Sequence, residues 1–144
     1  MNSRYALLTR LATDRTDAAA KLMGQAQQRL VQAGQKLAQL EQFLAEYRMQ
    51  RIQRASTGMS AVQWADYQHF LERIETAVNA QREELVLREA ECEATRTRWL
   101  AERKKLKAFE TLDEQAAQRE QAVKARREQK LTDELATRGF RRPR

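Results

Sequence analysis

The feature that most constrains the fold is a heptad pattern of apolar and small residues along most of the chain. These residues recur at alternating intervals of three and four, first through Ala19, Met23, Ala26, Leu30, Ala33, Leu37, Leu40, Leu44 and Tyr47. The pattern breaks at residues 56–58 and resumes at Trp64 without a later change of phase. Such spacing keeps one stripe of a helix against a partner helix. The sequence therefore predicts two long packed helices, residues 1–54 and 61–135.

The break between the two helices has the residues of a tight turn, predicted over residues 55–60. Gly58 can adopt the left-handed backbone conformation that ends a helix. Ser60 and Gln63 form a capping box, and Met59 and Trp64 occupy the hydrophobic-staple positions around that cap. A connection this short reverses the chain. The predicted fold class is all-α: one domain, residues 1–144, built as an antiparallel coiled-coil hairpin.

The register of the two helices stays open at this point. Antiparallel seams that bring unlike layers together would give paired residue numbers that sum to about 111 or about 118. In either register Ala19 lies beside Cys92 or Trp99, and the alanines of the first helix face the larger residues of the second. This places small side chains opposite large ones, as close packing requires.

Composition favours a thin coiled coil over a globule. The 144 residues include one proline and four glycines, and 33% are charged. Two arms of about 50 residues would form a rod about 75 Å long, without a cleft that could desolvate a substrate. There is no apolar run of spanning length and no signal-peptide pattern, so a cytoplasmic protein is expected. The single cysteine excludes an internal disulfide and fits a reducing compartment.

Residues that could carry chemistry are few. Cys92 lies on the predicted seam and is best explained as a small apolar packing residue. His69 has no second histidine or cysteine at ligand spacing, and no glycine-rich phosphate loop is present. We therefore expect no catalytic residue, no metal site, no cofactor and no enzymatic activity.

An apolar excess near the turn is the strongest candidate for a binding site. The residues of this predicted stripe are Leu40, Phe43, Tyr47, Phe70, Ile74 and Ala77. A two-helix seam cannot bury both this stripe and the heptad stripe, and contiguous exposed apolar surface usually marks a partner site. In the alternative interpretation, Leu40 and Ile74 belong to the core and only Phe43 and Phe70 protrude.

From Asp113 onward, the second predicted helix extends beyond the end of the first and has no predicted intramolecular partner. Helix propensity stays high to about Leu135, so we expect a fraying helix followed by a basic disordered tail, residues 136–144. The formal net charge of +7 would suit a nucleic acid, an acidic protein or an anionic lipid surface. Acidic residues interrupt the basic ones and aromatic stacking platforms are lacking, so we expect no nucleic-acid partner.

The chain resembles the FliJ family of flagellar type III export proteins. The resemblance lies in Glu46-Tyr47-Arg48, the Gly58 turn, the W-x-x-Y-x-x-F pattern from Trp64 to Phe70, and Trp99-Leu100 before Lys104-Lys105-Leu106. It implies a coiled coil like the central stalk of rotary ATPases. It also implies three partners: the hexameric export ATPase, the cytoplasmic domain of the export-gate protein FlhA, and flagellar export chaperones.

Such a protein would be cytoplasmic and peripherally associated with the inner-membrane export apparatus. The positions that match the family's gate-binding surface are the six residues of the predicted stripe. The free end of the hairpin, with Leu8, Leu11 and Arg15, would contact the ATPase ring. Rival interpretations are the equivalent stalk of a virulence secretion system, a basic nucleic-acid-binding coiled coil and a self-associating structural rod.

Overall fold

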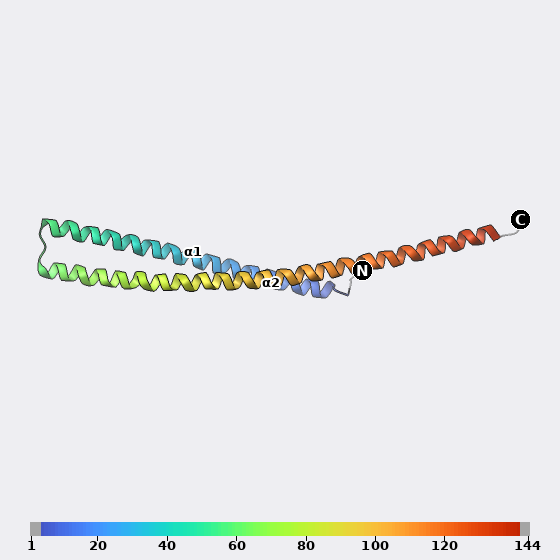
Figure 1. The fold of residues 1–144 in the computed structure, drawn as a ribbon, viewed down its shortest axis with the longest axis horizontal. Helices are drawn as coiled ribbons and strands as arrows, with labels where there is room; N and C mark the ends of the chain where they lie inside the picture. The colour runs from blue at the N-terminus through green and yellow to red at the C-terminus, as the bar shows by residue number, and fades with distance from the viewer. Residues whose placement is uncertain (1–3, 142–144) are drawn as a thin grey trace. The chain divides into compact units, whose positions relative to one another are not determined.

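Two long helices make up the protein. A computed structural model describes the backbone of residues 4–141 and the side chains of residues 4–139. Helix α1 spans Ala6–Thr57 and helix α2 spans Ala61–Arg141. This confirms the all-α class, and Figure 1 shows the two helices running back along each other from a short turn. The chain divides into two compact units: residues 19–99, here called the hairpin unit, and residues 1–18 with 100–144, the terminal unit.

The turn has the predicted chemistry and is shorter than expected. Gly58 has φ of 105°, which L-residues with a side chain rarely adopt. The Ser60 N–H donates to Gln63 Oε1 at 3.1 Å and the Gln63 N–H donates to Ser60 Oγ at 3.2 Å, so the capping box is confirmed. Helix α1 continues to Thr57, three residues beyond the predicted end. The hydroxyls of Ser56 and Thr57 donate to carbonyls of the last turn, which helps the helix persist.

The core of the hairpin unit lies where the heptad pattern predicted it. Leu44, Leu71, Ile74 and Val78 form a buried cluster, with Leu37, Leu40 and Tyr47 packed against it. Farther from the turn, α1 contributes the buried residues Ala19, Ala26 and Ala33, and α2 contributes Gln81. The core is one side chain deep, because every other face of the pair meets water.

The contacts between the helices favour the larger of the two sums expected from the sequence, about 118. The shortest ring pair, Tyr47 with Phe70, sums to 117, and the hydrogen-bonded pair Arg51 with Gln68 sums to 119. A sum of 114 would separate Arg48 from Glu75 by too great an axial distance for their 2.8 Å ion pair. In this register Ala19 lies level with Trp99, one of the two neighbours expected from the sequence.

Side-chain volume explains this register. Apolar residues of both helices meet in the cluster around Leu44 and Leu71. Farther from the turn, the register sets buried alanines of α1 level with larger residues of α2: Ala33 with Leu85, and Ala26 with Cys92. Gln81 is also buried on this seam, and its side-chain amide donates to the Ala33 carbonyl at 3.1 Å, so its polar group is satisfied.

The terminal unit is buried only where its two segments can pack. Ala12 and Thr16 are buried, and the Thr16 hydroxyl donates to the Ala12 carbonyl at 2.8 Å. Glu102, Leu106 and Phe109 of α2 are partly buried, whereas residues 117–139 are exposed throughout.

The predicted helix end at Leu135 is too early, since α2 runs to Arg141. Alanine, glutamine, glutamate and arginine all favour helix here, and the first proline is residue 143. Of the predicted tail, residues 142–144 lie outside the described part. Across residues 4–141, neither helix contains a stretch apolar enough to cross a membrane.

Candidate protein-interaction site

Four aromatic rings gather beside the turn of the hairpin unit. Phe43 and Tyr47 come from α1, Tyr67 and Phe70 from α2, and we call these four residues the aromatic cluster. The Tyr47 and Phe70 centroids are 4.5 Å apart, and those of Tyr47 and Tyr67 are 5.6 Å apart. Phe43 meets Tyr47 at 5.5 Å and meets Phe70 edge-on at 6.2 Å. These spacings are those of favourable tilted ring pairs, so the rings hold one another in place.

The six residues of the predicted stripe do not form one exposed surface. Ile74 is 6% exposed and belongs to the core, while Leu40 and Tyr47 pack partly buried against it. Ala77 is half-buried. Phe43 and Phe70 remain exposed at 43% and 37%. The alternative interpretation describes this arrangement: two phenylalanines protrude, and the neighbouring residues support them from below.

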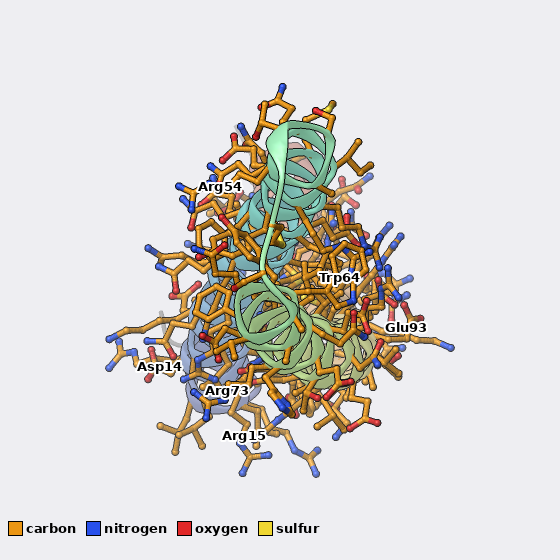
Figure 2. The ribbon with its side chains drawn as sticks, turned by 90° about the vertical axis from the view of Figure 1, so that its left-hand side faces the viewer. Asp14, Arg15, Arg54, Trp64, Arg73 and Glu93 are labelled. Atoms are coloured by element: carbon orange, nitrogen blue, oxygen red, sulfur yellow. The ribbon has the colours of Figure 1, made fainter. Side chains whose placement is uncertain are left out.

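Arginines frame the aromatic cluster on the turn side. The Arg51 guanidinium lies 4.7 Å from the Trp64 ring centroid, and that of Arg54 lies 5.6 Å from the Tyr67 centroid. Arg51 also donates to Gln68 Oε1 at 2.7 Å. These are cation–π distances, which explains why Trp64 can stay 46% exposed beside the turn. Figure 2 looks onto this end of the hairpin unit and shows Arg54 and Trp64 among the outward-pointing side chains.

Sequence reasoning missed Tyr67 and these arginines as members of the site. From the sequence, Tyr67 counted only as part of the W-x-x-Y-x-x-F pattern, although its ring contacts that of Tyr47 beside the exposed phenylalanines. The arginine contacts run between α1 and α2, so finding them requires the register. The available signal was the run of Arg48, Arg51 and Arg54 at intervals of three, opposite the aromatic residues that follow the turn.

Ion pairs across the seam fix the two helices around the aromatic cluster. Arg48 pairs with Glu75 at 2.8 Å, and Arg82 pairs with Glu41 at 3.2 Å. All four side chains are substantially exposed, so each pair stabilises the fold only slightly. Their main effect is on orientation, because each one ties α1 to α2 beside the rings.

A denser charge network lies farther along the hairpin unit. Arg88 donates to Glu91 at 3.0 Å and to Glu84 at 3.3 Å, and Arg29 pairs with Glu91 from α1. The hydrogen bond from Arg88, supported by that from Arg29, lowers the pKa of Glu91 below its ordinary value although partial burial opposes this. The same bonds, first to Glu91 and then to Glu84, raise the pKa of Arg88.

The predicted ATPase-contact residues lie in the terminal unit, on one face of α1. Leu8 and Leu11 are 41% and 47% exposed, and Arg15 is exposed as well. Spacings of three and four bring them together on a face that adjoins the buried residues Ala12 and Thr16. Leu7, which was not predicted, is also exposed beside them.

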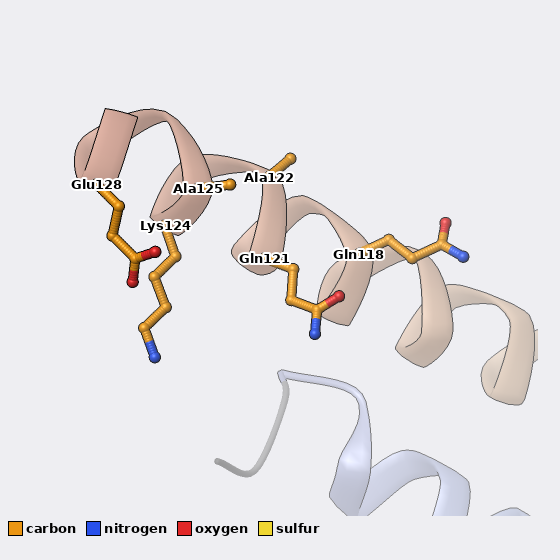
Figure 3. A pocket seen from close by; sticks show the side chains of 6 residues that line it. All are labelled: Gln118, Gln121, Ala122, Lys124, Ala125 and Glu128. Carbon is orange, nitrogen blue, oxygen red and sulfur yellow. The ribbon is translucent and has the colours of Figure 1, made fainter. Parts of the chain in front are cut away.

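The rest of the described surface offers little for small-molecule chemistry. The hollow in Figure 3 is lined by residues of α2 alone, and Gln121, Lys124 and Glu128 extend outward from it. Within residues 4–139, no three histidine, cysteine, aspartate or glutamate side chains come together as a metal site. Cys92 is a half-buried free thiol, and His69 lies near Glu72 on the surface.

Comparison with known proteins agrees with this geometry. Residues 1–144 match the family described as Flagellar FliJ protein. A flagellar FliJ protein of Escherichia coli (strain K12) is 29% identical over 133 residues, which cover 92% of this chain and 90% of that protein. One of Salmonella typhi is 27% identical over 128 residues, covering 89% and 87%. The match to the family over the whole chain, together with the helical hairpin, shows that this chain belongs to the flagellar FliJ protein family.

Proposed function

We propose that this component of the flagellar protein export apparatus is a non-enzymatic stalk with two separate binding sites. Its aromatic cluster would bind the export gate, through the cytoplasmic domain of FlhA. The α1 segment with Leu8, Leu11 and Arg15 would bind the hexameric export ATPase. The chain would thereby link the two assemblies at the cytoplasmic side of the export apparatus, where it would also assist the handling of export chaperones.

The observation that carries the gate assignment is the exposure of Phe43 and Phe70. Two aromatic rings that touch each other and remain more than one-third exposed are costly to leave in water. Aromatic anchors are also the residues that dominate the binding energy of protein interfaces. The rings are held by Tyr47 and Tyr67, so little side-chain entropy would be lost when a partner covers them.

The arginines around the aromatic cluster indicate the chemistry of that partner surface. Arg54 lies over Tyr67, and Arg51 lies over Trp64, both at the exposed edge of the cluster. A partner with an apolar centre and carboxylates at its edge would match this arrangement of rings and guanidinium groups. We therefore expect gate binding to weaken moderately with salt and strongly on loss of the rings.

The ATPase assignment is supported by the exposed apolar face of α1 in the terminal unit. Leu7, Leu8 and Leu11 are exposed leucines within one and a half turns. A narrow helical ligand with an apolar face suits the axis of a ring, where only a thin element fits. We infer that nucleotide hydrolysis belongs to the ring and that the stalk alters its rate.

Gate binding can be tested with a matched pair of double variants. Phe43→Ala with Phe70→Ala removes both exposed rings, whereas Val86→Ala with Leu87→Ala removes two exposed apolar side chains elsewhere in the hairpin unit. Calorimetric titration with the FlhA cytoplasmic domain should show at least tenfold weaker binding for the first pair and unchanged binding for the second. Equal binding by both variants, with helicity intact, would refute the gate assignment.

A further inference from the structure

Two charged residues of α2 lie immediately beside the exposed ring of Phe70. Asp66 precedes Phe70 by four residues and Arg73 follows it by three, so the three side chains share one face of the helix. All three are exposed. We call Asp66 and Arg73 the flanking charges; they are separated by about 10 Å along the helix. A partner that covers the Phe70 ring must therefore approach both of them.

The flanking charges have no partner within the described part of the chain. Across residues 4–139, neither forms a hydrogen bond or an ion pair. Opposite charges three or four residues along a helix usually supply such a pair. Between the flanking charges, those positions are held by Phe70 and by His69, and His69 lies near Glu72 instead. Both charges are thus left to water in the isolated chain.

Arg73 differs in this respect from the arginine nearest to the turn. The Arg54 guanidinium is held over the Tyr67 ring, 5.6 Å from its centroid. Figure 2 shows Arg54 and Arg73 on the same side of the hairpin unit, with Trp64 on the other side. Arg73 therefore adds to this side a guanidinium group that no residue in the described part of the chain engages.

The desolvation of the flanking charges restricts the kind of surface that can cover Phe70. A standard protein interface buries about 800 Å² on each partner, which reaches well beyond one helical turn on either side of the ring. Taking an unpaired charge out of water costs free energy unless the partner supplies an opposite charge. A purely apolar surface over Phe70 is therefore disfavoured, and a surface with complementary charges is preferred.

We propose that the flanking charges determine the specificity of the gate-binding site: a carboxylate of the gate faces Arg73, and a basic group of the gate faces Asp66. The assignment rests on the proposed function, since it takes the gate as the partner of the aromatic cluster. Asp66 lies nearer to the turn than Arg73 does. The two contacts together therefore fix the direction in which the gate surface lies along the hairpin unit.

The rings and the flanking charges have different roles in such a site. Phe43 and Phe70 supply apolar area, and the attraction between apolar surfaces has no direction. The flanking charges have a fixed order along α2, acid and then base, and favour only a surface with the reverse order. Complementary charges select a partner and its register more than they raise affinity. A uniformly acidic partner would gain at Arg73 and lose at Asp66.

Calorimetric titration of the full chain with the FlhA cytoplasmic domain tests the proposal. Asp66→Arg and Arg73→Asp should each weaken binding about tenfold, because each sets like charges against each other. The double variant that exchanges the two charges keeps the net charge of the chain. It should bind about a hundredfold more weakly than wild type, because effects at sites about 10 Å apart are nearly additive.

Glu89 and Arg96 provide a matched control. They are exposed on α2 with the same spacing of seven residues between acid and base, and Glu89 lies about 28 Å along the helix from Phe70. Glu89→Arg with Arg96→Glu should therefore leave gate binding unchanged. Circular dichroism checks the helicity of every variant. If a charge reversal unfolds the chain, the neutral variants Asp66→Asn and Arg73→Gln should each still weaken binding about threefold.

The outcomes separate this proposal from the gate assignment itself. Wild-type affinity of the exchange variant, or tighter binding by Asp66→Arg, would show that only net charge matters and would overturn the proposal. Phe43→Ala with Phe70→Ala belongs in the same series. Loss of binding in that variant, with normal binding by every charge variant, would refute the role of the flanking charges alone. Normal binding by the aromatic variant would refute the gate assignment, and the proposal with it.

Discussion

The loss of unfolding free energy should be larger for a core residue than for an exposed ring. Comparing Ile74→Ala with Phe43→Ala measures this difference. The two residues belong to the same predicted stripe. Ile74 is 6% exposed within the core cluster, whereas Phe43 is 43% exposed. If Phe43 serves to bind a partner, its truncation should lower the unfolding free energy of the isolated chain less than truncation of Ile74 does.

The magnitudes follow from the two environments. Truncation of a buried isoleucine to alanine costs about 2–5 kcal/mol, and a core one side chain deep can relax, so about 2–3 kcal/mol is expected for Ile74→Ala. Full burial of a phenylalanine is worth about 1.5–3 kcal/mol. Phe43 is little more than half buried, so its loss, together with its ring contacts, should cost about 1–1.5 kcal/mol.

Urea unfolding followed by tryptophan fluorescence provides the assay. Both tryptophans, Trp64 and Trp99, lie in the hairpin unit, so the signal reports on the part of the chain that holds both substitutions. Circular dichroism of the folded variants serves as the control for helicity. Equal loss of unfolding free energy in the two variants would show that Phe43 is a structural residue, and the docking interpretation would fail.

Further predictions concern the turn, the register and the charge network. Gly58→Ala should cost about 1–2 kcal/mol of unfolding free energy by urea titration, because alanine is strained at a φ of 105°. Ala26→Cys should crosslink to native Cys92 within one chain, using a short bismaleimide, faster than Met23→Cys does, because Ala26 lies level with Cys92 when paired numbers sum to about 118; a faster Met23→Cys reaction would contradict this register. The pKa of Glu91 is lower in the fold than its ordinary 4.5, so its contribution is complete above that value and is lost as the pH falls through the lowered pKa. The stability difference between wild type and Glu91→Gln should therefore shrink on acidification, and a difference that grew below pH 4.5 would contradict the assignment.

The seam could be predicted because it depends on periodicity alone. Every heptad position named in α1, from Ala19 to Tyr47, is buried or half-buried. The turn was equally accessible, since Gly58 and the Ser60–Gln63 box act through neighbouring residues. These interactions join residues that are close in the sequence, so they can be predicted without knowledge of the partner helix.

The choice between the two possible registers and the true extent of the exposed stripe were not accessible in the same way. Both depend on how side chains from distant segments fit together, as where the Gln81 amide reaches the Ala33 carbonyl. The assignment of Ile74 to an exposed surface failed for this reason, because Ile74 packs in a cluster with Leu44 and Val78 from both helices. The helix end beyond Leu135 was missed because propensity gives no sharp stop without a proline or a capped turn.

The most direct test of a two-site stalk measures gate binding and stimulation of the export ATPase side by side on two sets of variants. Phe43→Ala with Phe70→Ala should abolish gate binding and keep ATPase stimulation. Leu8→Ala with Leu11→Ala should lower ATPase stimulation several-fold and keep gate binding, because those leucines lie in the terminal unit. Loss of both activities in the aromatic variant, with its helicity intact, would contradict the separation of the two sites.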